Sequence, residues 1–428
     1  MNTIHKILTY AFFSSIVLAP FAVSDAADNC VAASGDPIRL GAIFPREAFF
    51  TTENSEYFKG IDAMRQAVNA CGGVVGRPIE WVYQPASNRE DAEAAARTLI
   101  NEDHVPLIVG SGLLAVNEGG RIAAEDLGAV YWEITEAVEP GGEWFFSIRP
   151  DNYQVGQATG HFVVDILGNA LAKPELKTAL IYENRPRGQT IAEGILDGLP
   201  TSPTLTYDYT DHLLDTGRLG VQLREEKIDV VILAAFEDDG DNLWYAAQQA
   251  DANVGAWVHV GGEGYQRNIC GRIGNADGMI SADASGPVNA QIRETRLGDI
   301  YAQYRSTYLA ENSQEPGELA DLAASGVYML LHYVLPAANG DYSAASIRNA
   351  ARSLNNPASL GMMGEGINFK DSNGSNQSSS VLFQQAQSGA FCTLSPSDLA
   401  TCAAAIQPFP TWRERALAEE KQTCNPQT

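Results

Sequence analysis

The sequence is poor in positive charge. It contains 28 Lys and Arg against 53 Asp and Glu among 428 residues, which gives a formal net charge of −25. Such a surplus of negative charge repels phosphate backbones and anionic lipid headgroups. We therefore expect neither a nucleic acid nor a membrane surface as a partner.

Common catalytic and metal-binding motifs are also missing. The six cysteines form no C-x-x-C and no two histidines have H-E-x-x-H spacing, so zinc and thioredoxin-like sites lack the spacing that they need. The sequence has neither a G-x-S-x-G elbow nor a phosphate loop ending in Gly-Lys. We expect no metal, no cofactor and no enzymatic activity.

The N-terminus has the pattern of an export signal. Residues 1–26 contain one lysine, then an apolar run that is broken by Pro20, then small residues that end at Ala26. This order is typical of a cleavable signal peptide, and the run is short for a membrane span. We expect a periplasmic protein that is not inserted in the membrane after cleavage.

All six cysteines follow this segment, and an oxidising compartment favours disulfides. Cys30 precedes the first predicted strand and Cys71 ends the first predicted helix. Both positions fall at the same end of a βα layer, so we expect these two cysteines to pair. Spacing does not fix the other partners, and we expect two further pairs, Cys392 with Cys402 and Cys270 with Cys424.

Predicted strands and helices alternate along the chain. The first run has strands at 38–44, 79–83, 105–109 and 129–132 and helices at 55–70, 91–101 and 114–126. The second run has strands at 178–182, 204–209, 230–233 and 256–260 and helices at 152–168, 189–198, 215–226 and 241–250. Two such runs predict an α/β protein with two doubly wound, parallel-sheet lobes.

After about residue 285 the pattern becomes helical, with helices predicted at 290–310, 318–335 and 343–353 and a last strand at 381–385. The stretch 319–338 is apolar enough for a membrane span. It carries Asp321 and His332, however, so we predict a buried core helix. The tail at 391–428 contains three cysteines and is predicted to form an extension with a short surface helix.

One turn is similar to a dinucleotide-binding motif. A strand ending at Val109 runs into Gly110-Ser-Gly-Leu-Leu-Ala115, which opens a helix, and Glu133 follows about 20 residues later. The export signal and the position on the third strand argue against a cofactor. We interpret the small residues as allowing a helix N-terminus to approach a small polar ligand.

Several pieces of sequence together point to a known family. They are the strand 38–44, Tyr57-Phe-Lys-Gly60, Gly72-Gly73 with Gly76-Arg77, Val109-Gly110-Ser111, and Val260-Gly-Gly-Glu263-Gly264. From Ile38 to about Gln385 the chain resembles the type I periplasmic solute-binding proteins of the leucine/isoleucine/valine-binding class, which serve ABC importers. The resemblance implies two lobes, joined by three crossovers, that close on a small ligand in the cleft between them.

The resemblance also implies how the chain is divided. We expect a first lobe at 36–149 plus 285–360, a second lobe at 150–284 plus 361–390, and a C-terminal extension at 391–428. It further implies a monomer whose partners are a small-molecule ligand and the permease subunits of an ABC transporter.

In the second lobe the resemblance implies three ligand-binding residues. Glu263 matches an acid that in the family accepts hydrogen bonds from a ligand ammonium, a role that suits a carboxylate. Phe236 falls where the family often has an aromatic that closes over the ligand. Arg187 stands where the family often has tyrosine, and it either binds a ligand carboxylate or pairs with Glu183.

In the first lobe, the hydroxyl groups that hold the carboxylate of amino-acid ligands in the family are largely replaced by acids. This implies a ligand with amine, amide or hydroxyl donors, flanked by aromatic rings as stacking or cation–π partners. The residues concerned are Leu114 in the first loop, Glu133 and Glu136 in the second, Glu53 as a further acid, and Trp132 and Tyr265 as the aromatics.

Two other functions fit the same residues. An exported sensor with this fold would report a ligand to a signalling partner instead of delivering it to a permease. An α/β oxidoreductase would use the turn from Gly110 to Ala115 to bind a nucleotide. The leading interpretation remains capture of a small polar ligand for an importer, without any bond being made or broken.

Overall fold

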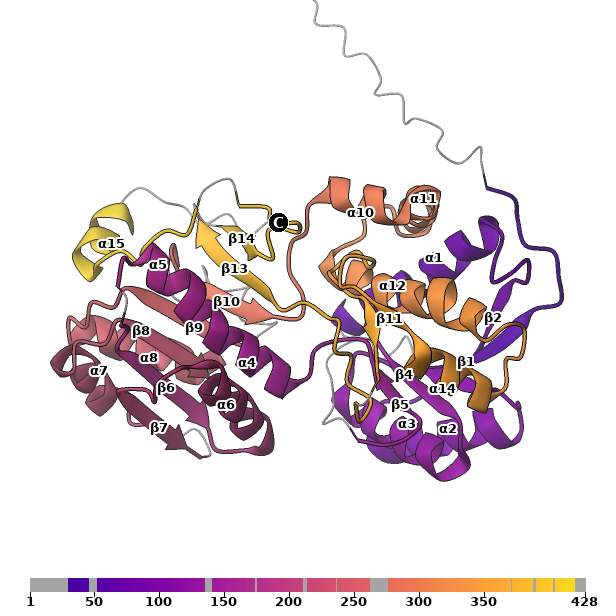
Figure 1. The fold of residues 1–428 in the computed structure, drawn as a ribbon, viewed down its shortest axis with the longest axis horizontal. Helices are drawn as coiled ribbons and strands as arrows, with labels where there is room; N and C mark the ends of the chain where they lie inside the picture. The colour runs from indigo at the N-terminus through magenta and orange to yellow at the C-terminus, as the bar shows by residue number, and fades with distance from the viewer. Residues whose placement is uncertain are drawn as a thin grey trace, which may run out of the picture.

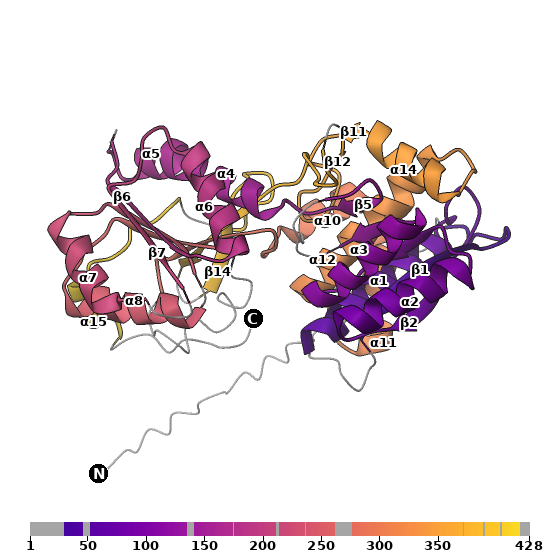
Figure 2. The same cartoon turned by 90° about the horizontal axis from the view of Figure 1, so that it is seen from below.

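The computed structural model describes residues 30–45, 52–134, 141–173, 175–210, 214–235, 237–261, 276–370, 372–387, 390–402 and 405–419. Two α/β lobes lie side by side and are linked by chain segments between them (Figure 1). The view from below shows the same division (Figure 2). The predicted fold class, with two lobes built on sheets covered by helices, is confirmed.

The first lobe has a sheet of five parallel strands in the order β2-β1-β3-β4-β5. The strands are β1 (Ile38–Phe44), β2 (Ile79–Pro85), β3 (Leu107–Val109), β4 (Val130–Glu133) and β5 (Phe145–Ser147). Helices α1 (Thr52–Ala70), α2 (Arg89–Asn101) and α3 (Leu114–Leu127) alternate with them. Because α2 and α3 pack against each other, they share one face, and their apolar side chains form a separate core there.

Helices from late in the chain complete the other face of this lobe. They are α10 (Ala290–Leu297), α11 (Asp299–Asn312), α12 (Glu318–Met329) with its continuations η4 (Leu330–Val334) and α13 (Leu335–Ala337), and α14 (Ala344–Ser353). Strands β11 (Asn355–Asn356) and β12 (Ile367–Asn368) form a small ladder beside them. The segment Glu318–Ala337 is apolar enough to cross a membrane, but 83% of its most apolar window is buried, which confirms the predicted core helix.

The second lobe has a sheet of seven strands in the order β14-β13-β10-β9-β8-β6-β7. Its strands are β6 (Thr178–Glu183), β7 (Leu205–Tyr209), β8 (Val230–Ala234), β9 (Ala256–Val260), β10 (Ile280–Asp283), β13 (Leu382–Gln387) and β14 (Ala390–Ser395). Strands β6 to β10 pair in parallel, whereas β13 and β14 pair antiparallel. The sheet is thus mixed. Strand β14 pairs antiparallel with β13 because it follows β13 too closely for the crossover that parallel pairing needs.

The helices of this lobe are α4 (Asn152–Phe162) with η3 (Val163–Leu167) and α5 (Gly168–Ala170), then α6 (Pro186–Gly198), α7 (Thr216–Glu225) and α8 (Glu237–Gln249). The last helix, α15 (Trp412–Glu419), lies in the C-terminal extension. The extension is more than a surface appendage. Trp412 is buried in the second lobe's core, where its ring packs edge-on against Trp244, and Arg415 lies over Phe409.

Two of the expected disulfides are confirmed. Cys30 is bonded to Cys71 and Cys392 is bonded to Cys402. The first bond ties the start of the described chain to the residue that follows α1. The remaining expected pair, Cys270 with Cys424, lies outside the described residues.

Three segments connect the lobes. They lie between β5 and α4, between β10 and α10, and between β12 and β13. The third crossing comes later than the expected residue 360, because apolar side chains beyond that point complete the first lobe's core. These side chains are Met362, Met363, Ile367 and Phe369, all of them fully buried.

Helices α1 and α12 approach each other closely at Gly60. A Cβ at Gly60 would overlap the backbone of Ala320, including its carbonyl oxygen. Backbone cannot give way as a flexible side chain can, so a larger residue must push the two helices apart.

We expect Gly60→Ala to lower the free energy of unfolding by about 1–3 kcal/mol, the usual cost of overpacking. Urea unfolding followed by circular dichroism measures the change. Gly217→Ala in α7 is the matched control, because a Cβ there meets nothing within 4 Å. Equal stability of the two variants would contradict a role for Gly60 in this helix contact.

Candidate functional site

The carboxyl ends of the parallel strands are where open α/β sheets bind ligands. In the first lobe β1, β3 and β4 end there, and in the second β6, β8 and β9 do. Four of the loops that follow these strands include residues outside the described part of the chain.

A buried hydrogen-bond network forms this edge of the first lobe. The Asn117 side-chain amide donates to the Ser111 carbonyl over 2.9 Å and to Glu133 Oε1 over 2.8 Å. The Ser111 amide and the Tyr131 hydroxyl both donate to Asn117 Oδ1, over 3.0 and 2.9 Å. Burial, and then the nearby Glu133 carboxylate, raise the pKa of the Tyr131 hydroxyl. Glu133 therefore helps to fix the loop after β3 through the Asn117 side chain, which bonds to both.

Helix α3 begins directly beside this network. Leu113 is its N-cap, and no side chain among the described residues caps the helix. Uncapped amides at a helix N-terminus carry partial positive charge and attract hydrogen-bond acceptors or anions. Leu114, the first helical residue, is 58% exposed and adds an apolar surface. This corner can hold an acceptor group of a ligand together with an apolar part.

The two glycines of the turn after β3 serve packing. A Cβ at Gly110 would overlap the Tyr131 hydroxyl, and a Cβ at Gly112 would overlap the ring of Tyr57. Tyrosine rings thus occupy the space that a dinucleotide motif leaves open for a pyrophosphate. The glycine spacing in this turn is explained without a nucleotide.

The matching edge of the second lobe brings charged groups together. At the end of β6, Glu183 is buried and pairs with Arg185, whose Nε lies 3.0 Å from Glu183 Oε1. Arg187 Nη2 donates to the carbonyl of Gly261, the residue after β9. Helix α6 starts here with Arg185 as its N-cap, and within the described residues no side-chain cap is seen. Arg187 thus bridges two strand ends of this lobe.

Trp132 is a core residue and does not line this site. Its side chain is fully buried, its indole N–H donates to the Gly326 carbonyl over 3.0 Å, and its ring packs against Phe146 and Phe369. These contacts leave no ring face for a ligand, which corrects the expected stacking role. Glu53 lies in α1, and its side chain is not among those described. The other expected site residues outside the described part are Glu136, Phe236, Glu263 and Tyr265.

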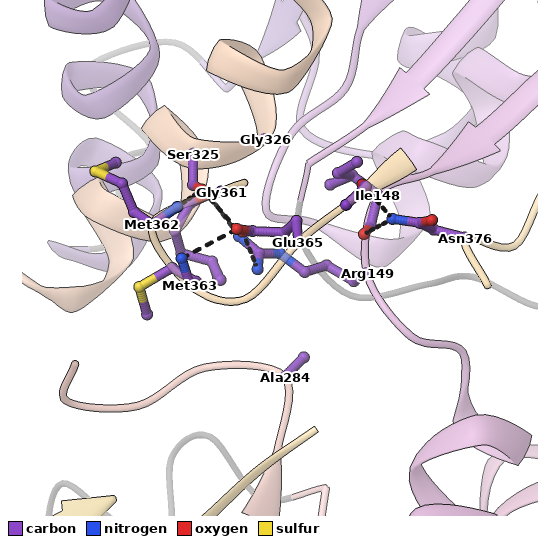
Figure 3. Close-up of polar contacts among 12 residues, drawn as sticks. Ile148, Arg149, Ala284, Ser325, Gly326, Gly361, Met362, Met363, Glu365 and Asn376 are labelled. Carbon is purple, nitrogen blue, oxygen red and sulfur yellow. Dashed lines mark hydrogen bonds and ion pairs between the residues drawn. The ribbon is translucent and has the colours of Figure 1, made fainter. Parts of the chain in front are cut away.

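A buried ion pair holds the hinge between the lobes (Figure 3). Arg149 Nη1 lies 2.5 Å from Glu365 Oε1, and the two side chains are 1% and 0% exposed. Glu365 Oε2 accepts hydrogen bonds from the Ser325 hydroxyl and the Met363 amide, over 2.7 and 3.0 Å. Arg149 Nη2 donates to the Leu322 carbonyl over 2.6 Å. The pair therefore binds the first crossing, the segment before the third crossing and α12 together.

Asn376 extends this connection. Its side-chain amide donates to the carbonyls of Ile148 and Gly366, each over 3.0 Å. The hydroxyl of Ser375 donates to Asp151 Oδ2 over 2.5 Å. These hydrogen bonds thus join the first and third crossings where the chain leaves the first lobe.

Comparison with known proteins agrees with this geometry. The sequence profile of the periplasmic binding proteins matches residues 37–390. The chain belongs to this family. A relative from Brucella abortus, Leu/Ile/Val-binding protein homolog 7, is 25% identical over 387 residues, covering 85% of this chain and 92% of the relative.

Solved structures show the same fold. A putative branched-chain amino acid ABC transporter protein from Silicibacter pomeroyi superposes with a TM-score of 0.70 at 18% identity, covering 88% of this chain and all of that protein. An ABC transporter substrate-binding protein from Desulfitobacterium hafniense, in complex with Leu, gives a TM-score of 0.63 at 17% identity, covering 84% of this chain and 100% of that protein. The fold is therefore that of the branched-chain amino acid binding proteins.

The sequence did not point to the residues of the hinge. Arg149 and Glu365 are 216 residues apart, and neither stands in a recognisable motif. A weak signal exists, since Arg149 directly follows the apolar run 145–148 and Glu365 lies between two glycines in an otherwise apolar stretch. A charged residue in such a setting is buried only with a partner.

We expect Glu365→Gln to lower the free energy of unfolding by about 3–5 kcal/mol, because it leaves the Arg149 charge buried without its counterion. Urea unfolding measures the loss. The double variant Arg149→Met, Glu365→Gln should be more stable than Glu365→Gln alone.

The control is Arg305→Gln, which removes an ion pair with Glu315 whose side chains are 50% and 53% exposed. That variant should change stability by about 1 kcal/mol or less. If Glu365→Gln were as mild as this control, the buried pair would not be the anchor of the hinge.

Proposed function

We propose that the protein is the exported solute-binding component of an ABC importer. It captures a small amine-, amide- or amino-acid-like ligand between its lobes and closes on it by rotation at the hinge. The proposal rests on the groups found at the strand ends. In each lobe a helix, α3 or α6, has no side-chain cap among the described residues and begins close to a buried glutamate, Glu133 or Glu183. Membership of the periplasmic binding protein family supports it.

The first lobe supplies hydrogen-bond donors and an apolar surface. The amides at the start of α3 suit a carboxylate or carbonyl oxygen of the ligand, and the exposed Leu114 suits an apolar part of it. The buried Glu133 carboxylate next to this loop favours a ligand that also carries a hydrogen-bond donor or a positive charge, apart from the group bound by the amides. A zwitterion or an amide has both kinds of group.

The second lobe supplies the complementary charges. Arg187 stands at the start of α6, close to the end of β9. By family resemblance, Glu263 accepts hydrogen bonds from a ligand ammonium, Phe236 and Tyr265 cover the ligand, and Glu53 and Glu136 add acceptors. A ligand held by groups from both lobes makes its full set of contacts only when the lobes are closed, and this drives closure.

The leucine bound by the Desulfitobacterium hafniense protein belongs to the proposed ligand class. The present chain differs at the loop after β3, where Leu114 stands in place of the hydroxyls common in the family. We therefore propose a ligand that depends less on hydroxyl donors than an ordinary branched-chain amino acid does.

Residues 1–26 are proposed as the export signal, and the mature monomer delivers its ligand to the permease subunits. The two disulfides suit an oxidising compartment. No bond is made or broken in this cycle. Binding and release follow from the equilibrium between open and closed lobes.

The test is a thermal-shift screen of residues 27–428, unfolded and refolded to strip any bound ligand. A ligand at a hundredfold excess over Kd stabilises the folded state by about 2.7 kcal/mol, enough to raise the melting temperature by several degrees. We expect a shift with one class among amino acids, polyamines and amides. A shift with nicotinamide cofactors alone would overturn the proposal.

We expect Glu263→Gln to weaken binding of the screened ligand at least tenfold, because it removes a charge-assisted hydrogen bond to an ammonium group. Isothermal titration calorimetry measures the affinity. Glu175→Gln is the control. Glu175 is exposed and lies just before the N-terminal end of β6, away from the carboxyl ends of the strands where the site is proposed. Equal affinities of the two variants would remove Glu263 from the site.

We expect Leu114→Asp to change stability and binding in opposite directions. An acid in the first turn of α3 stabilises the helix by about 0.3–1 kcal/mol, while it occupies the amides proposed for the ligand. The melting temperature without ligand should stay equal or rise, and the affinity should fall. Unchanged affinity would place the ligand away from the α3 N-terminus.

A further inference from the structure

The loop closed by the Cys392–Cys402 disulfide leaves the second lobe and contacts the first. It begins in β14, at the edge of the second lobe's sheet, and its residue Leu399 is fully buried. Leu399 belongs to the large hydrophobic cluster that fills the first lobe and also includes Leu382 of β13. It contacts the first lobe at Gly364, where a Cβ would be 2.7 Å from Leu399 Cδ1. A side chain from beyond β14 thus packs against the first lobe.

Polar contacts fix the loop on both sides of Leu399. Asp398 Oδ2 lies 2.5 Å from Arg296 Nη2, and Arg296, from α10 of the first lobe, also donates to the Gly361 carbonyl over 2.7 Å. On the other side, the Thr393 hydroxyl donates to the carbonyl of Pro287, in the second crossing, over 2.5 Å. In Figure 1, β14 of the left lobe and α10 of the right lobe both lie toward the top of the view.

The loop is also well connected within itself. The amides of Thr401 and Cys402 donate to the Thr393 carbonyl, over 2.9 and 3.1 Å, and the Thr393 amide donates to the Thr401 hydroxyl over 2.8 Å. The disulfide closes the same ring of residues, and both cysteines are only partly buried. Leu399 is therefore held at the tip of a stiff loop whose disulfide lies within reach of a reductant.

We propose that this loop, residues 392–402, is a strap across the hinge that limits how far the lobes open, and that its disulfide is required for that restraint. The three crossings are covalent connections about which the lobes can bend. The strap adds a fourth connection between the lobes, which is non-covalent. Wider opening would pull Leu399 away from Gly364 and separate Asp398 from Arg296. Without the disulfide the loop can lengthen, so the lobes can separate while Leu399 stays in place.

The inference rests on the proposed hinge motion, but its test needs no ligand. Small-angle X-ray scattering of the ligand-free protein reports the separation of the lobes as the radius of gyration. We expect Cys392→Ser, Cys402→Ser and, separately, Leu399→Ala to increase this radius. Combining the three substitutions should give no further increase, since all of them act on the same strap.

The control is the pair Cys30→Ser, Cys71→Ser, which removes a disulfide located within the first lobe and should leave the radius of gyration unchanged. Circular dichroism checks that each variant is folded. If the cysteine variants do not fold, Asp398→Asn and mild reduction of the wild-type protein replace them, with the same expected increase.

An unchanged radius in the folded strap variants would overturn the strap. An equal increase in the Cys30, Cys71 control would do the same. A thermal-shift screen without any hit would count against the proposed function, yet would leave this readout intact, so the two proposals fail separately.

Discussion

The arrangement of the two lobes depends on one buried ion pair. Taking the Arg149 guanidinium and the Glu365 carboxylate out of water is costly, and their attraction offsets the cost only with good geometry and further hydrogen bonds. Those bonds come from Ser325, Met363 and Leu322. All three residues belong to the first lobe's packed interior. The ion pair therefore fixes the crossings to the first lobe at the point where they leave it.

The two halves of the site are prepared to different degrees. In the first lobe, Ser111, Asn117 and Glu133 form a closed network on rigid elements, so the loop after β3 is fixed before a ligand arrives. In the second lobe, Arg187 reaches from α6 to the end of β9 and joins two strands. In the proposed function a ligand meets this fixed half of the site, and such preorganisation lowers the free-energy cost of binding.

Much of this fold was predictable from the sequence, and the failures have physical causes. Long apolar runs such as 38–44 identify buried parallel strands, whereas β5 (FFS) and β10 (ISAD) are short and contain polar residues, so they form no continuous apolar run. Trp132 was misassigned because in a strand of four residues its neighbour Glu133 faces the other way, and nothing local shows which face is the core. The Arg149–Glu365 pair joins distant parts of the chain, which a single sequence cannot reveal.

The way in which both lobes are distributed along the chain bears on assembly. Strands β1 to β5 and strands β6 to β10 each lie within one continuous stretch, but both cores also need late residues, such as Phe369 in the first lobe and Trp412 in the second. Contacts between such distant residues form slowly, because a long loop must close before they are gained. A chain emerging N-terminus first therefore carries two unfinished lobes until almost all of it is free.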